Sequence, residues 1–224
     1  MPLNVIVLGP PGAGKGTQAE RLAATFGVPK ISTGDILREA VHAGTDIGRQ
    51  AAEIMSAGQL VGDELMIEIV RERLSRADVA RGFVLDGFPR TVTQAVALDE
   101  MLDGRGEVTV LHITVPEDEI VRRLTTRRIC EACGATADPG VAPVAPCARC
   151  GGALVQRRDD GEVVIRERLQ VFDRETRPLV AHYRQRPRFF TVDGHTAPSE
   201  VAGRIRALIE SGASAAVATR SGGA

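Results

Sequence analysis

A glycine-rich segment near the N-terminus is the feature that most restricts the fold. Residues 9–17 read GPPGAGKGT and match the pattern G-x-x-x-x-G-K-[ST]. An apolar, β-branched run at residues 3–8 precedes the pattern, and a helical stretch with Leu22 and Phe26 follows it. A strand, this loop and a helix in that order form a phosphate-binding loop. The segment therefore predicts an α/β domain with a nucleoside triphosphate site.

The residue types in this loop suit a triphosphate and its magnesium ion. Glycines let backbone N–H groups turn towards phosphate oxygens at the positive end of the following helix. The ammonium group of Lys15 suits the β- and γ-phosphates, and the hydroxyl of Thr17 can ligate Mg²⁺. Asp86 follows the apolar run 83–85, at the sheet edge where ligands bind. We expect Thr17 and Asp86 to hold Mg²⁺.

Apolar runs alternate with helical segments along the rest of the chain. Runs typical of buried strands occupy residues 83–85, 108–115 and 189–192. Between them apolar residues recur at helical spacing, and Pro198 marks the start of the last helix. This alternation predicts a parallel sheet wrapped by helices on both sides. Residues 32–61 and 126–160 lack the alternation, and we interpret them as insertions from the core.

Charge is balanced over the whole chain. There are 28 basic and 29 acidic residues, and Lys15 and Lys30 are the only lysines. A net charge of −1 provides no general attraction for nucleic acids or acidic membranes. No apolar run approaches the roughly 20 residues of a membrane span, and the N-terminal run is too short for a secretory leader. We therefore expect a cytoplasmic protein that binds anions at a local cluster.

Three segments together resemble the signatures of the adenylate kinase family. They are residues 9–18, residues 31–38 (ISTGDILR) and residues 86–91 (DGFPRT), in that family's order. The resemblance covers residues 3 to 210, approximately, and implies the P-loop nucleoside monophosphate kinase fold. It also implies reversible, Mg²⁺-dependent transfer of a phosphoryl group from ATP to AMP, giving two ADP. We expect the protein to act as a monomer.

The resemblance implies a core with two mobile insertions. The core comprises residues 1–31, 62–125 and 161–210. Residues 32–61 correspond to the flap that covers the nucleoside monophosphate, and residues 126–160 to the lid. Residues 211–224 are rich in Gly, Ala and Ser, and we expect them to form a disordered tail.

The AMP site implied by the resemblance draws on the flap, on the segment after residues 83–85 and on two later arginines. Arginines offer planar forks of donors to a dianionic phosphate, and a glutamine amide can pair with an adenine edge. The expected AMP contacts are Thr33, Arg38, Gln59, Leu60, Val61, Gly87, Phe88, Pro89, Arg90, Gln94, Arg157 and Arg168.

Four arginines after residue 120 recur at the family's spacing, and the resemblance places them around the phosphates. Phosphoryl transfer needs alignment and neutralisation of charge, which a closing ring of arginines supplies. Asp159 and Asp160 are expected to pair with these arginines or to act at the lid hinge. The expected catalytic residues are Lys15, Arg90, Arg127, Arg157 and Arg168. The expected ATP contacts are Gly12, Ala13, Gly14, Lys15, Gly16, Thr17, Arg123, Arg127 and Thr196.

All four cysteines lie in the second insertion. Cys130 and Cys133 form one C-x₂-C pair and Cys147 and Cys150 form another, with 13 residues between the two pairs. Four thiolates at this spacing form a closed tetrahedral Zn²⁺ site. The alternatives are four free thiols or two disulfides, and a cytosolic setting argues against disulfides. We predict a structural zinc ion in a lid like that of many bacterial adenylate kinases, with a shorter spacer than is usual.

Two other functions stay open from the sequence. A kinase for UMP, CMP or another monophosphate would use the same loop and arginines, although the long lid and Gln94 favour AMP. A zinc-ribbon module that binds nucleic acid and switches with nucleotide is disfavoured by the neutral charge and by only 6 Phe, 1 Tyr and 0 Trp. None of the 4 histidines falls in a motif, which disfavours phosphohistidine chemistry.

Overall fold

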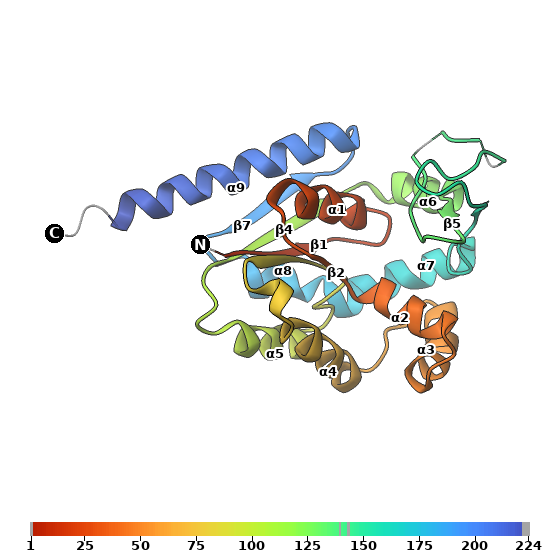
Figure 1. The fold of residues 1–224 in the computed structure, drawn as a ribbon, viewed down its shortest axis with the longest axis horizontal. Coiled ribbons are helices and arrows are strands. Elements are labelled where there is room, and N and C mark those ends of the chain that lie inside the picture. Colours follow the sequence, from red (N-terminus) through yellow and green to blue (C-terminus); the bar gives the residue numbers. More distant parts are fainter. Residues whose placement is uncertain (1, 139, 143, 221–224) are drawn as a thin grey trace.

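A parallel sheet between two layers of helices forms the centre of the molecule (Figure 1). The structure is a computed structural model that describes residues 2–138, 140–142 and 144–220. Every neighbouring pair of strands in the sheet is parallel, as the sequence predicts. In spatial order the strands are β2 (Lys30–Ser32), β3 (Gly82–Asp86), β1 (Leu3–Leu8), β4 (Val108–Thr114) and β7 (Phe189–Asp193).

Helices cover both faces of this sheet and also form the flap. One face is covered by α1 (Lys15–Phe26) and α9 (Pro198–Arg220). The other is covered by α4 (Asp63–Leu74), α5 (Val92–Leu102) and α8 (Pro178–Tyr183). The remaining helical elements are α2 (Thr33–His42), α3 (Asp46–Ser56), the 3₁₀ turn η1 (Ala77–Val79), α6 (Glu117–Thr126), α7 (Glu162–Val171) and the π-helical η2 (Phe172–Thr176).

The continuous apolar run of β1 follows from its place between these layers. Val5 and Val7 pack with residues of α1 and α9, whereas Ile6 and Leu8 pack with residues of α4, α5 and α8. Successive side chains of a strand point to opposite faces of the sheet. A strand that is covered on both faces is therefore apolar at every position, and these four side chains are at most 3% exposed.

The two insertions flank the carboxyl ends of the central strands (Figure 1). The first consists of α2 and α3, whose N-termini are capped when Ser32 and Thr45 accept hydrogen bonds from the N–H groups of Asp35 and Gly48. The second contains a short antiparallel pair, β5 (Ile129–Cys130) and β6 (Leu154–Val155). Both insertions therefore stand beside the edge at which parallel sheets bind ligands.

Helix α9 extends into the segment for which the sequence predicts a disordered tail. It begins at Pro198, as predicted, and residues 211–220 are helical. An alanine-rich segment has high helix propensity and continues the preceding turns at little cost. Residues 221–224 of that tail lie outside the described residues. In the part of the chain that the structure describes, no helix is long and apolar enough to cross a membrane.

Candidate active site

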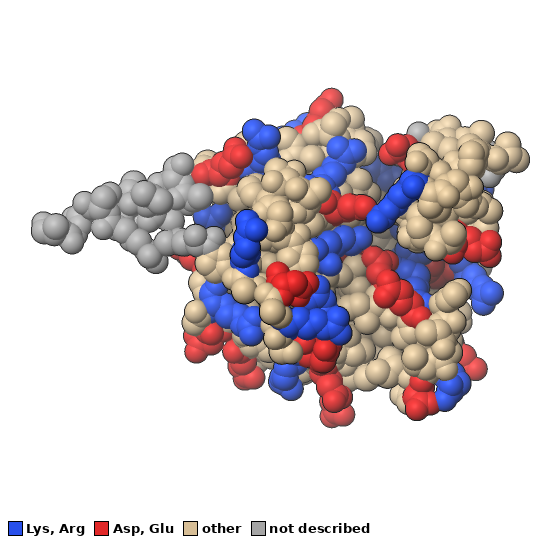
Figure 2. All heavy atoms as spheres, viewed as in Figure 1, with Lys and Arg blue, Asp and Glu red and all other residues tan. Residues whose placement is uncertain are grey.

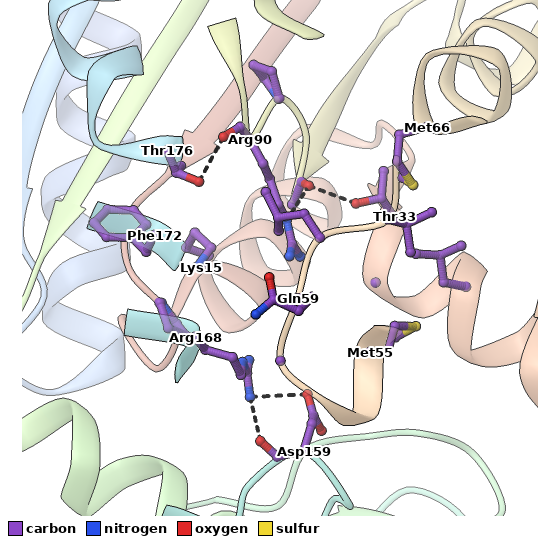
Figure 3. Close-up of a pocket in the computed structure, with 18 of the residues that line it drawn as sticks. Lys15, Thr33, Met55, Gln59, Met66, Arg90, Asp159, Arg168, Phe172 and Thr176 are labelled. Atoms are coloured by element: carbon purple, nitrogen blue, oxygen red, sulfur yellow. Dashed lines mark hydrogen bonds and ion pairs between the residues drawn. The ribbon is translucent and has the colours of Figure 1, made fainter. Parts of the chain in front are cut away.

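A pocket lies where the P-loop, the flap, the lid and α7 meet (Figure 3). Lys15 comes from the P-loop, Thr33 and Arg38 from α2, Arg90 from the segment after β3, and Arg168 from α7. Of the expected AMP contacts, the pocket is lined by Thr33, Arg38, Gln59, Leu60, Val61, Gly87, Pro89, Arg90, Gln94, Arg157 and Arg168. The fold thus brings residues more than 130 positions apart into one cavity.

Phe88 is the expected AMP contact that is not part of this lining. Its side chain is 1% exposed and packs in the core with residues of α4, α5 and α8. Three apolar side chains that the motifs did not mark, Met55, Met66 and Phe172, line the pocket instead. Their signal in the sequence is the same as that of any helix face turned towards a core, so sequence reasoning passed over them.

Hydrogen bonds between neighbouring segments hold Arg90 in place next to the flap helix α2. The hydroxyl of Thr33 and Nε of Arg90 both donate to the carbonyl of Gly87, at 2.9 and 2.8 Å. The hydroxyl of Thr176 donates to the carbonyl of Arg90 at 2.9 Å. Gly87 has φ of +83°, and a Cβ there would lie 2.8 Å from the Thr33 hydroxyl. Only glycine fits this turn, which sets the direction of the Arg90 side chain.

Lys15 is half-buried among arginines. Its ammonium group donates to the carbonyl of Pro10 at 2.8 Å. Burial lowers the pKa of Lys15 to about 7, against an attraction from Asp86 that raises it; the charges of Arg90, Arg168 and Arg127 lower it further. An ammonium ion in such surroundings gains from an added negative charge. The site is therefore electrostatically suited to phosphate.

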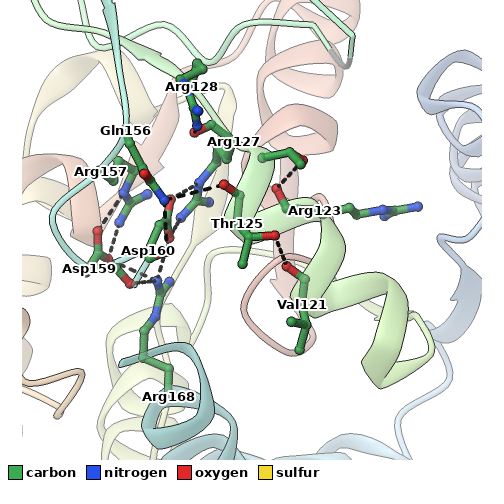
Figure 4. Close-up of polar contacts among 11 residues, drawn as sticks. Val121, Arg123, Thr125, Arg127, Arg128, Gln156, Arg157, Asp159, Asp160 and Arg168 are labelled. Carbon is green, nitrogen blue, oxygen red and sulfur yellow. Dashed lines mark hydrogen bonds and ion pairs between the residues drawn. The ribbon is translucent and has the colours of Figure 1, made fainter. Parts of the chain in front are cut away.

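Two neighbouring aspartates of the lid hold three arginines in place (Figure 4). Arg127 donates to both oxygens of Asp160 at 2.7 and 2.6 Å, and Arg157 to both oxygens of Asp159 at 2.9 and 2.6 Å. Nη1 of Arg168 lies 3.1 Å from an oxygen of each aspartate. The expected pairing of these aspartates with the arginines is confirmed.

Opposing effects set the pKa values in this cluster. Burial alone would raise the pKa of Asp159, but the hydrogen bond and charge of Arg157, with the charges of Arg168 and Arg127, lower it to about 2. Burial lowers the pKa of Arg168 to about 10, although Asp159 acts in the other direction. The aspartate is ionised and the arginines are charged at neutral pH, so the cluster can exchange one anionic partner for another.

A second ion-pair group lies where β2 leads into the flap helix α2. Nη2 of Arg38 is 2.5 Å from Oδ1 of Asp35, and Nζ of Lys30 is 3.2 Å from Oδ2. Burial would raise the pKa of Asp35, but the charge and hydrogen bond of Arg38 and the charge of Lys30 lower it to about 2. Lys30, which had no role in the sequence analysis, thus helps to hold the carboxylate that orients Arg38.

The expected donor-site residues surround the P-loop and the start of α9. Gly12 packs against α6, where a Cβ would lie 3.0 Å from Leu124. Nη2 of Arg123 donates to the carbonyls of Gly194 and His195 at 2.9 and 3.4 Å. The hydroxyl of Thr196 accepts from Arg204 at 3.2 Å. Arg123 therefore supports the backbone next to Thr196, another expected ATP contact.

The residues expected to hold Mg²⁺ lie together at the start of α1. Oδ2 of Asp86 lies 3.3 Å from the position that a Cβ on Gly16 would take, so the carboxylate faces the backbone next to Thr17. Thr17 lies in the first turn of α1. A carboxylate and a hydroxyl are oxygen ligands of the kind that Mg²⁺ prefers. The donor set fits this ion.

The four cysteines of the lid form one cluster. All four Sγ atoms lie within 4.8 Å of one another. The Sγ atoms of Cys130 and Cys150 are 3.4 Å apart, and those of Cys133 and Cys147 are 3.7 Å apart. A tetrahedron with Zn–S bonds of about 2.3 Å has edges of about 3.8 Å. The cluster therefore fits a structural Zn²⁺ ion, and no disulfide joins the described cysteines.

Comparisons with known proteins agree with this geometry. The family model for adenylate kinase matches residues 7–188. The chain is 49% identical over 213 residues to an adenylate kinase of Archaeoglobus fulgidus, which covers 93% of this chain and 98% of that protein. It is 48% identical over 212 residues to one of Moorella thermoacetica, with 92% and 98% covered. On these matches, and with its P-loop, paired insertions and arginine cluster, the chain belongs to the adenylate kinase family.

Proposed function

We propose that this chain transfers the γ-phosphoryl group of ATP directly to AMP, giving two ADP, and that it acts as a cytoplasmic monomer. The observation that carries the proposal is the single pocket that joins Lys15 of the P-loop to Arg38 and Arg90 beside the flap and to Arg157 and Arg168. The loop that binds the triphosphate and the arginines that can bind a second phosphate lie in one cavity. Such an arrangement suits transfer between two nucleotides.

The donor nucleotide is held at the P-loop. We infer that the backbone of residues 12–16 surrounds the phosphates, while Lys15 contacts the β- and γ-phosphates. Thr17 and Asp86 would hold Mg²⁺, which neutralises phosphate charge when bound. The adenine would lie near Arg123 and the backbone of Gly194 to Thr196, and Arg127 would serve the ATP phosphates.

The acceptor nucleotide is held under the flap. Arg38 and Arg90 would grip the AMP phosphate, and Gln94 would meet the adenine edge. The segment Gln59–Val61 would cover the nucleoside. Arg38 is already oriented by Asp35 and Arg90 by the carbonyl of Gly87. Little side-chain freedom is lost on binding, because the forks are held in place beforehand.

The arginines perform the electrostatic part of the reaction. In-line transfer develops charge on the oxygens around the moving phosphorus, and Lys15, Arg90, Arg127, Arg157 and Arg168 neutralise it. Asp159 and Asp160 hold three of these arginines at the pocket until phosphate oxygens replace the carboxylates as partners. Closure of residues 32–61 and 126–160 over the core would exclude water, which would otherwise accept the phosphoryl group.

Coupled kinetics with AMP, CMP, UMP and GMP as acceptors tests the substrate. We expect the highest kcat/KM with AMP. A preference for a pyrimidine monophosphate would contradict the proposed acceptor while leaving phosphoryl transfer in place.

Arg90→Ala tests the proposed chemistry. Loss of this half-buried guanidinium group should lower kcat by about 10²-fold or more, because the charge that develops on the phosphoryl oxygens loses a preorganised donor. Arg76→Ala is the matched control, since Arg76 forms an exposed ion pair with Glu72. Rates in Arg90→Ala close to those of the control would refute the assigned role, provided that both variants keep the circular dichroism spectrum of the unmutated protein.

A further inference from the structure

Asp63 is a side chain that the motifs did not mark and that contacts the proposed adenine-binding residue. It is the first residue of α4, where its charge suits the helix N-terminus. Its Oδ1 accepts from Nε2 of Gln94 at 2.7 Å, and its Oδ2 accepts from the hydroxyl of Thr91 at 2.9 Å. Thr91 caps the helix that carries Gln94. One carboxylate therefore anchors both the start of α5 and the amide that faces the pocket.

The Gln94 amide is held from both of its ends. Its Oε1 accepts from the backbone N–H of Arg90 at 2.8 Å, while its Nε2 donates to Asp63. A backbone N–H only donates and an ionised carboxylate only accepts. Rotating the amide by half a turn would set donor against donor and acceptor against acceptor. The orientation is thus dictated by the chemistry of the two partners, in a side chain that is 2% exposed.

A fixed amide offers its remaining groups in a fixed order. After these two bonds, Gln94 keeps one N–H hydrogen and one oxygen lone pair. Adenine presents an amino donor at position 6 beside an acceptor at N1, whereas a 6-oxo purine presents an acceptor beside a donor. An amide that can turn over pairs with either base. An amide that cannot turn over matches only one of them.

We propose that Asp63 is a positioning residue that fixes the Gln94 amide and so makes the acceptor site selective for a 6-aminopurine. The inference rests on the proposed function, in which AMP binds at Gln94. Asp63 does not itself line the pocket among the described residues. Its effect on the base passes through Gln94. Sequence reasoning missed it because nothing in the local pattern links it to a residue 31 positions later.

Steady-state kinetics of Asp63→Asn with AMP and IMP tests the inference. Asparagine keeps the shape of the Asp63 side chain, but its amide can donate a hydrogen bond as well as accept one. It therefore no longer disfavours the rotated Gln94 amide, whose oxygen would face residue 63. The preference for AMP over IMP in kcat/KM should fall about three- to tenfold, the effect of one hydrogen bond. The change should appear in KM for AMP, with kcat nearly unchanged. Glu64→Gln, the next residue on α4, exposed in the structure, should keep the preference.

A double-mutant cycle separates positioning from a general effect on the fold. In the Gln94→Ala background, Asp63→Asn should cause no further loss of base preference, because its route to the base is gone. Asp63→Ser provides a second variant without a carboxylate, and thermal unfolding is measured for each protein. An unchanged AMP preference in Asp63→Asn, or a fall in stability and kcat with no change in preference, overturns the inference. Loss of folding in both variants also overturns it.

The unmutated enzyme distinguishes this inference from the proposed function. If it does not prefer AMP over IMP and the pyrimidine monophosphates, the proposed acceptor is wrong. If it prefers AMP and the Asp63 variants do so equally, only the role of Asp63 is wrong.

Discussion

Lys15 differs from four arginines of the site in the kind of partner it has. Arg38, Arg127, Arg157 and Arg168 each lie against a carboxylate. Lys15 donates to a backbone carbonyl, and its pKa is lowered to about 7 by burial, with further lowering by arginine charges. A lysine with a lowered pKa gains a proton when an anion arrives. Its charge state is therefore coupled to nucleotide binding.

Nucleotide binding should raise the pKa of Lys15. In the Lys30→Arg variant Lys15 is the only lysine, so a ¹³C-lysine-labelled sample has one side-chain signal. We expect its titration midpoint near 7 in the free protein and well above 7 with ATP, because the phosphates favour the ammonium form. Binding above pH 7 should accordingly take up a proton.

The sign of the effect on stability follows from the same shift. Lysine has a pKa of 10.5 before burial and about 7 in the folded site, so between these values the unfolded chain binds the extra proton. The contribution of Lys15 to the unfolding free energy therefore rises with pH in this window. A midpoint near 10.5 in the free protein would contradict both expectations.

The lid and the flap depend on different local devices. The lid contains two strands of 2 residues each and a cluster of four cysteines. The flap consists of two capped helices, and the loop after α3 packs against α7. So short a strand pair cannot bury enough apolar surface to fold alone. The lid therefore relies on its metal site, and the flap on packing.

Removal of zinc should destabilise the lid without touching the reacting groups. Chelation followed by return of Mg²⁺, or Cys147→Ser, should lower the melting temperature by several degrees and speed hydrogen exchange in residues 129–155, because the bound ion stabilises the folded lid. Adding Zn²⁺ back to the chelated protein is the control. Turnover abolished while the lid amides stay protected would show that zinc takes part in the chemical step.

Gly58→Ala should weaken AMP binding through the flap. Gly58 has φ of +77°, and a Cβ there would lie 3.0 Å from Arg168 Cγ and 3.2 Å from the carbonyl of Val164. Gly104→Ala is the control, because Gly104 has φ of +72° with no atom within 4 Å of its Cβ position. Backbone strain should cost both variants about 1 kcal/mol in urea unfolding. Only Gly58→Ala should raise KM for AMP, and equal KM values would refute the packing argument.

The molecule as a whole concentrates positive charge at one place while remaining nearly neutral. Basic and acidic side chains are interspersed over the face shown in Figure 2. The net charge is −1, yet arginines from α2, the segment after β3, the lid and α7 meet in one pocket. Local clustering provides the attraction for nucleotides that the total charge does not.

A dinucleotide with two adenosines joined by a phosphate chain should stabilise the protein more than either substrate alone. Such a ligand contacts the P-loop, the flap and the lid arginines at once. Because it binds only the folded protein, all of these contacts add to the free energy of unfolding. Differential scanning fluorimetry should show a larger rise in melting temperature than saturating ATP or AMP. Arg90→Ala should lose much of that rise. A shift equal to that of one nucleotide would contradict a site that spans both.

The features that short-range rules control could be predicted from the residues alone. The P-loop depends on backbone freedom, the buried strands on continuous apolar runs, and the cysteine pairs on spacing between near neighbours. The parallel sheet and the cysteine cluster are accordingly found where they were predicted. Family motifs extended the prediction to most of the pocket lining.

Long-range packing decided the rest. Phe88 lies in the core rather than in the pocket, and Asp63 holds Gln94 from another element. The partner of a side chain depends on which elements the fold brings within 3 or 4 Å of it. A local sequence pattern does not give distances between residues that lie far apart in the chain. Local motifs determine which chemical groups the site contains, but contacts between distant parts of the chain determine how these groups are oriented.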